Sequence, residues 1–412
     1  MLRRNLFALG GAAAVAGCSG PERLASLPEA FRARRSFKGL PEDCRVVMDG
    51  SDDRAIAQIA LDALRREVEY SERSKTPLGP ADFLAISGGG ENGAYGAGLL
   101  TAWTQLGTRP TFKAVTGVST GALSAPFAFL GSAYDRNLEE VYTQIRPEDV
   151  LHSRGLLTAL LSDSLYDSTP LLKTIRRFVT AEFLAAIAHE YVERGRLLLV
   201  ATTNLDVPVA VMWNMGSIAA SGAANAPELF ARILLASASI PGAFPPVMID
   251  IETDGERFQE MHVDGGTTAQ VLFYPPSFGG AEVSQKLPQA DQATARLALR
   301  RPRKLYVIRN GTLNAQNETI ERSTMKIAGR AISTLIQTQG VGDLFRLYLL
   351  SKRDGIDYNV SWIPSSFTDK IERPFDPPYM KKLYEVGRAE MLAGRAWSKL
   401  PPGFDPTPIS ET

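Results

Sequence analysis

The sequence predicts an α/β fold in which helices cover both faces of a mostly parallel sheet. From about residue 82 onward, short apolar runs of strand length alternate with longer segments of helical periodicity. This alternation favours parallel pairing, because each crossover helix must pack on a face of the sheet. The predicted strands are 83–87, 114–118, 197–203, 209–215, 247–252, 261–264 and 304–309. The predicted helices are 94–106, 121–130 and 227–238, with further helix filling much of 321–352 and 378–399.

Composition sets limits on the class of protein. The chain has 412 residues, of which 44% are hydrophobic and 22% charged, which is typical of globular proteins. The formal net charge is zero, which argues against a nucleic-acid-binding protein. Two cysteines exclude a disulfide scaffold, and three histidines limit the chemistry of metals and catalytic triads. One large domain with insertions fits these numbers.

The first residues predict an export signal. Arg3 and Arg4 precede a short apolar stretch, Leu6–Ala16, which is too short to span a bilayer. This stretch ends in Val15-Ala16-Gly17-Cys18, which resembles a bacterial lipobox. The resemblance implies that residues 1–17 are removed and that Cys18 carries lipid. An ordinary signal peptide remains the alternative, and the paired arginines leave export by the Sec or the twin-arginine route open.

The predicted lipid anchor implies a place in the cell. Ser19 and Gly20, and no aspartate, come directly after Cys18, so we expect a lipid-anchored protein of the bacterial cell envelope, at the outer membrane and facing the periplasm. Residues 18–80 are expected to form a tether without strands, containing one packing helix at about 53–70. Residues 81–400 then form the main domain, in which the polar segment 279–296 is expected to be an exposed loop.

The first motif with chemical meaning is Gly88-Gly89-Gly90-Glu91-Asn92-Gly93, between a predicted strand and a predicted helix. Glycines there let backbone N–H groups approach a negative charge. The string also satisfies the dinucleotide-binding pattern, but that site needs an acidic residue about 20 positions later. Residues 99–118 contain neither Asp nor Glu. An oxyanion hole is therefore favoured over a nucleotide site, with a simple flexible turn as the plain alternative.

The second motif is Gly117-Val118-Ser119-Thr120-Gly121, again between a strand and a helix. This is the context of a nucleophile elbow, in which small residues allow a sharp turn that exposes the serine hydroxyl. A serine in an ordinary tight turn is the alternative interpretation. The flanking strand and helix favour Ser119 as a nucleophile.

The histidines offer no obvious base for Ser119. His189 lacks the second histidine of a zinc helix, His152 lies in a polar stretch, and no histidine follows His262. We predict neither a metal nor a cofactor. The third motif, residues 261–266, ends a predicted strand in Asp264-Gly265-Gly266. A buried carboxylate there could accept a proton from Ser119, whereas His262 is expected to be a packed strand residue. Taken alone, Asp264 is better explained as the start of an Asp-Gly turn.

Together these motifs resemble the patatin-like phospholipase family. Two further stretches strengthen the resemblance: residues 164–171 and 236–246. It implies a three-layer α/β/α fold and a Ser–Asp dyad, with Ser119 as nucleophile, Asp264 as base and residues 88–93 as oxyanion hole. Gly117 and Gly121 would form the elbow. Many members carry Arg or Lys where this chain has Asn92, so a cationic contribution to the oxyanion hole is not expected here.

The resemblance implies hydrolysis of lipid acyl esters, of the phospholipase A or lysophospholipase type, through an acyl-enzyme. Two other functions remain open: a non-catalytic lipid-binding envelope lipoprotein, and an esterase or thioesterase for small soluble acyl substrates. The expected partners are an acyl-ester substrate and a membrane reached through the anchor, without nucleic acid. The apolar run 151–161 suits a buried helix better than a flap over the site.

Overall fold

The computed structural model describes residues 21–34, 37, 39–154, 162–274, 289–313 and 319–404. The predicted signal peptide, Cys18 and residues 155–161 lie outside the described residues. Of the described helices, none is both long enough and apolar enough to cross a membrane.

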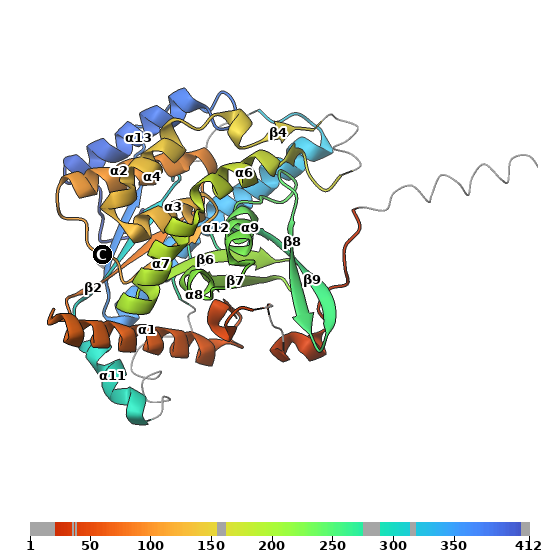
Figure 1. The fold of residues 1–412 in the computed structure, drawn as a ribbon. Helices are drawn as coiled ribbons and strands as arrows, with labels where there is room; N and C mark the ends of the chain where they lie inside the picture. Colours follow the sequence, from red (N-terminus) through yellow and green to blue (C-terminus); the bar gives the residue numbers. More distant parts are fainter. Residues whose placement is uncertain are drawn as a thin grey trace, which may run out of the picture.

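A central sheet organises the described part of the chain, where nine strands join it (Figure 1). Five of them are parallel neighbours in the order β11-β10-β2-β3-β6, and the others pair antiparallel at the β6 side. The mostly parallel sheet predicted from the sequence is therefore confirmed. The strands are β1 Arg45–Val47, β2 Ala81–Ile86, β3 Ala114–Val118, β6 Leu197–Asn204, β7 Val209–Asn214, β8 Val247–Thr253, β9 Glu256–Asp264, β10 Arg303–Arg309 and β11 Asp357–Trp362.

Helices cover both faces of the sheet. Leu84 and Ile86 of β2 belong to a large apolar core with residues of α2, α3, α9 and α13, whereas Ala85 packs in a second core with α12. Alternate side chains of one strand thus enter different cores, which defines three layers. The α-helices in the described part of the chain are α1 Asp53–Ser74, α2 Gly93–Gln105, α3 Thr120–Leu130, α4 Asp135–Thr143, α6 Thr169–Phe178, α7 Ala181–Arg194, α8 Met215–Ala220, α9 Ala226–Ser237, α11 Gln289–Arg300, α12 Thr324–Asp354 and α13 Pro377–Leu392.

Helix α2, which starts directly after the glycine-rich loop, is fixed by close packing against α13. A Cβ atom on Gly98 would lie 1.9 Å from the carbonyl oxygen of Tyr384, and one on Gly387 would lie 2.1 Å from that of Tyr95. The two helices therefore approach each other at a distance that only glycine allows. This contact holds the beginning of α2, and with it the end of the loop.

Two predictions about elements were wrong, and one strand was not predicted. The tether region contains a strand, β1, because Arg45–Val47 pairs with the backbone of β7, and three residues are too few to show a periodic pattern. The segment 279–296 is not simply a loop, since α11 begins at Gln289; its polar sequence suits a surface helix, and Arg65 of α1 pairs with its Asp291. Strand β11 was not predicted at all, and it lies in the sheet beside β10.

Candidate functional site

Ser119 occupies a strained turn between β3 and α3. Its backbone angles are φ 54° and ψ −125°, a combination that residues with a side chain rarely adopt. The neighbouring glycines make the turn possible. A Cβ atom on Gly117 would lie 2.4 Å from the carbonyl oxygen of Gly121, and one on Gly121 would lie 2.3 Å from that of Ile86. The turn has the geometry expected of a nucleophile elbow.

The end of helix α9 fixes both the elbow and the strand that carries Asp264. The N–H of Ser119 donates to Oγ of Ser237 over 2.9 Å, and Ser237 in turn donates to the carbonyl of Ala201 over 2.6 Å. The N–H of Asp264 donates to the carbonyl of Ser239 over 2.9 Å. Sequence reasoning missed Ser237 and Ser239 as supports. Their only signal was the run of small residues before the proline-rich stretch.

Asp264 ends β9, and within the described residues only one of its two carboxylate oxygens accepts a hydrogen bond. The residue is only 3% exposed, and Oδ1 accepts a hydrogen bond of 2.7 Å from the N–H of Gly266. Oδ2 is buried and has no hydrogen-bond partner in the described structure. Ser119 lies near enough to influence the carboxylate, but no Ser119–Asp264 hydrogen bond of normal distance and angle is present. The carboxylate therefore retains an open acceptor position at Oδ2.

Burial sets the proton affinity of this carboxylate. It raises the pKa of Asp264 to about 7, while the Ser119 hydroxyl and the Gly266 N–H oppose the rise. A carboxylate with a pKa near neutrality is a far stronger base than an ordinary aspartate. The group is therefore suited to accept a proton at physiological pH.

His262 takes no part in this arrangement. It is fully buried, with Nδ1 2.8 Å from Oγ1 of Thr202 and Nε2 3.1 Å from Oε2 of Glu260. Glu260 is paired with Arg45 in turn, and burial lowers the pKa of His262. His152 and His189 are not buried. Across the described residues, no group of three or more His, Cys, Asp or Glu side chains is placed to hold a metal ion.

The glycine-rich loop uses some of its N–H groups internally. The N–H of Gly88 donates to the carbonyl of Gln270 over 3.1 Å, and that of Asn92 donates to Gly89 over 3.1 Å. The N–H of Gly93 bonds to carbonyls within the loop. The carboxylate of Glu91 accepts from its own N–H, and burial raises its pKa. Of the residues 88–93 that were predicted to form an oxyanion hole, only two in the described structure therefore have backbone N–H groups left to donate to a ligand.

These two donors are the N–H groups of Gly89 and Gly90, for which the described structure gives no backbone acceptor. Both glycines have positive φ, 152° and 57°. A Cβ atom on Gly89 would lie 2.0 Å from the carbonyl oxygen of Asn310 at the end of β10. Asn310 also binds Ser87 through its N–H and its side-chain amide, at 2.8 and 3.0 Å. It therefore fixes the loop, and sequence reasoning gave no sign of it.

Asn92 is held by a different residue. The hydroxyl of Tyr379 donates to its Oδ1 over 2.6 Å, which orients the amide and leaves only its NH₂ group to donate elsewhere. Asn92, which stands where many family members carry a positive charge, is therefore hydrogen-bonded to α13.

Gln270 links the glycine-rich loop with the turn after Asp264. Besides accepting from Gly88, its Nε2 donates to the carbonyl of Gly266 over 3.3 Å. Its own N–H donates to Oδ2 of Asp343 on α12 over 2.7 Å. One glutamine therefore connects the two loops that meet at Ser119, and it was not singled out in the sequence.

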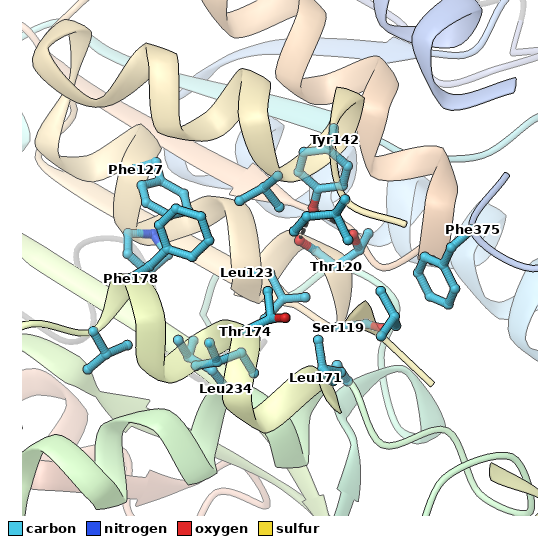
Figure 2. Close-up of a pocket in the computed structure, with 18 of the residues that line it drawn as sticks. Ser119, Thr120, Leu123, Phe127, Tyr142, Leu171, Thr174, Phe178, Leu234 and Phe375 are labelled. Carbon is cyan, nitrogen blue, oxygen red and sulfur yellow. Dashed lines mark hydrogen bonds between the residues drawn. The ribbon is translucent and has the colours of Figure 1, made fainter. Parts of the chain in front are cut away.

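A largely apolar cavity begins at Ser119. The space between its side chains amounts to about 900 Å³, part of which is open to solvent. Figure 2 shows Ser119 and Phe375 towards one end and Phe127 and Phe178 at the other. Between them lie mostly aliphatic and aromatic side chains. The lining includes Leu123, Val141, Ile145, Val150, Leu171, Ile175, Val179, Phe183, Leu234, Ile240, Phe244 and Met380.

An elbow serine at the carboxyl edge of a parallel sheet, above an apolar cavity, is the layout of a serine hydrolase. Residues 84–275 match the sequence model of the patatin-like phospholipases. The sheet continues beyond the matched part of the chain, because β10 and β11 lie after it.

Two solved structures show a weak overall likeness. VipD from Legionella pneumophila is 10% identical, with 77% of this chain and 66% of that chain covered and a TM-score of 0.38. Human GIVD cytosolic phospholipase A2 is 12% identical, with 66% and 49% covered and a TM-score of 0.28. This chain thus spans about half to two thirds of those proteins, and likeness at this level carries no argument about function. No curated protein sequence matched the chain.

Proposed function

We propose that this domain hydrolyses acyl esters of lipids, as a phospholipase A or lysophospholipase, with Ser119 and Asp264 as a catalytic dyad. The observation that carries the proposal is the position of Ser119 at the end of a cavity lined almost entirely by apolar side chains. Such a lining suits a fatty acyl chain, because moving each methylene group from water into an apolar site is favourable by about 0.8 kcal/mol.

In the proposed reaction, ionised Asp264 takes the proton of the Ser119 hydroxyl through its unpartnered Oδ2. Oγ of Ser119 attacks the ester carbonyl, and the N–H groups of Gly89 and Gly90 stabilise the oxyanion. The alcohol leaves with the proton from Asp264, which gives an acyl-enzyme. Water then attacks this ester while Asp264 takes one of its protons. The bond between the acyl group and Oγ breaks, Asp264 returns the proton to Oγ of Ser119, and the fatty acid leaves.

A substrate series tests the proposal against the two other functions. We expect fatty acid release from phospholipid vesicles, and a higher kcat/KM for nitrophenyl esters of long chains than for the acetyl ester. A lipid-binding lipoprotein without catalysis would hydrolyse neither substrate. An esterase for small soluble substrates would favour the acetyl ester and leave vesicles intact. Fatty acid titration and nitrophenol absorbance measure the two activities.

We also propose that a lipid on Cys18 holds the protein at a membrane of the bacterial envelope, at the outer membrane facing the periplasm. The support is the lipobox-like sequence before Cys18. Cys18→Ser is expected to move the protein from the membrane fraction to the soluble fraction on immunoblots of fractionated cells. Cys44→Ser is the matched control, because Cys44 is buried in the folded domain and should leave the fractionation unchanged. Unaltered membrane association of Cys18→Ser would contradict the anchor.

A further inference from the structure

The N-terminal half of α12 exposes large apolar side chains. Ile327 is 54% exposed and Leu335 is 69% exposed, and Ala331 between them is exposed as well. The helix is nonetheless well formed there, since Oγ of Ser323 caps it by accepting from the N–H of Lys326 over 3.3 Å. A capped helix with its apolar side chains in solvent has a face that no other described segment of the chain covers.

The sequence of this half is amphipathic. Ile327, Ala331 and Leu335 are spaced by four residues and therefore share one side of the helix. Lys326 lies about 100° and Arg330 about 60° away from Ile327 around the helix axis, and Arg322 just before the helix adds a third positive charge. Residues 322–342 contain no Asp or Glu. A cationic helix with an exposed apolar stripe is typical of segments that lie in the interface of an anionic membrane.

The other half of the same helix is anchored next to the site. The side chain of Gln339 donates to the carbonyl of Thr268, and Oδ2 of Asp343 accepts from the N–H groups of Gln270 and Val271. These contacts are to the segment that directly follows Asp264. From Gln339 back to Thr324 the helix continues for roughly 22 Å. Figure 1 shows the light-blue ribbon of α12 extending past the sheet.

We propose that the N-terminal half of α12 docks on an anionic lipid surface, with Ile327 and Leu335 inserted among the acyl chains and Arg322 and Lys326 against the headgroups. The role of this docking rests on the proposed function, because a lipid hydrolase must reach a substrate that lies in the membrane. The docked helix brings the carboxyl edge of the sheet, with Ser119, to the membrane that holds the substrate. Charge decides for lipid over a second copy of this chain, because two such cationic helices would repel each other.

Vesicle flotation tests the docking without interference from the anchor or from catalysis. Every protein is the full chain with Cys18→Ser and Ser119→Ala, mixed with phosphatidylcholine vesicles with or without phosphatidylglycerol. We expect this parent to float with the anionic vesicles, and Ile327→Ser with Leu335→Ser to weaken the binding about tenfold or more. Arg322→Gln with Lys326→Gln should weaken binding only to the vesicles that contain phosphatidylglycerol.

Leu106→Ser is the matched control. Leu106 is 45% exposed and follows the end of α2, at the opposite edge of the sheet, so its replacement should leave flotation unchanged. A parent that does not float, or equal binding by the Ile327/Leu335 variant, would overturn the proposal. So would a dimer in sedimentation velocity that this variant dissociates, because the face would then bind a second copy.

Failure of the docking and failure of the proposed function give different results. With Ser119 restored, the Ile327/Leu335 variant should hydrolyse short soluble esters as fast as the protein with both apolar side chains. Loss of vesicle hydrolysis alone supports the docking. If no protein hydrolyses any ester, the proposed function fails, and flotation still decides whether the helix binds lipid.

Discussion

Replacing Ser119 with alanine is expected to lower kcat/KM for acyl esters by roughly four to six orders of magnitude. The variant loses the oxygen that attacks the ester, and no neighbouring side chain can replace it, because the lining of the cavity is mostly apolar. The loop donors and the cavity remain, so substrate binding should change little. Nitrophenyl ester hydrolysis and fatty acid release from vesicles measure the loss.

The control for this variant is another buried serine. Ser217 on α8 is 2% exposed, and its hydroxyl donates to Asp43 over 2.5 Å. Ser217→Ala removes a buried hydroxyl of the same kind and should retain activity in whatever fraction of the protein is folded. A fluorophosphonate probe should label Ser119 in the wild-type chain and leave the Ser119→Ala variant unlabelled. Folded Ser119→Ala protein that still hydrolyses esters at the wild-type rate would rule out the dyad.

Replacing Asp264 with asparagine should remove activity to a similar extent, since an amide cannot accept the Ser119 proton. In the wild type, the reaction needs ionised Asp264, whose pKa burial raises to about 7. The value of kcat/KM should therefore rise as pH increases through about 7 and then level off. A pH–rate profile that is flat between pH 5 and pH 9 would show that Asp264 is not the base.

The same substitution should make the protein more stable at alkaline pH. Above about pH 7, folded and unfolded chains both carry an ionised Asp264, and burying that charge is unfavourable. As pH falls below 7, the folded chain takes up a proton before the unfolded chain does, so stability rises. The amide that replaces the carboxylate has no charge, and we expect Asp264→Asn to increase the free energy of unfolding at pH 8 by up to about 4 kcal/mol. Urea denaturation at pH 8 and pH 5 measures the difference.

Glu260, on the same strand, provides the contrast. Burial alone would raise its pKa, but Arg45 and His262 hold the pKa well below the usual range, so the ionised form is stabilised by folding. Glu260→Gln leaves Arg45 buried without its partner and should destabilise the protein by about 3–5 kcal/mol. The two buried carboxylates of β9, Glu260 and Asp264, thus predict stability changes of opposite sign. If Asp264→Asn and Glu260→Gln destabilised the protein equally, burial of the Asp264 charge would not be unfavourable, and the prediction would be wrong.

The local framework of the site could be predicted because its signals are short in sequence. Strand β3 has the bounds that the apolar run 114–118 predicted, and the glycines on either side of Ser119 are required by the turn itself. Asp264 ends its strand as expected. Each of these features depends on residues within a few positions of one another, where backbone sterics and alternation of side chains decide the conformation.

The supports of the site could not be predicted, because each joins segments distant in sequence. Asn310 binds the loop after β2 across 223 positions, and Ser237 binds the elbow across 118 positions. Gln270 connects loops whose order in the sequence says nothing about their contact. Only the packing of β10 beside β2, and of α9 against β6, brings these side chains to the same place.

The sequence by itself therefore determined the mostly parallel α/β fold, the elbow at Ser119 and the strand end at Asp264, since these follow from local steric and apolar patterns. The tertiary structure alone decided how deeply Asp264 is buried. Within the described part of the chain, it also decided which loop N–H groups lack an internal acceptor and which face of α12 is left uncovered. The physical reason is that hydrogen-bond acceptors, desolvation and exposure belong to the assembled chain. They depend on neighbours that no single segment specifies.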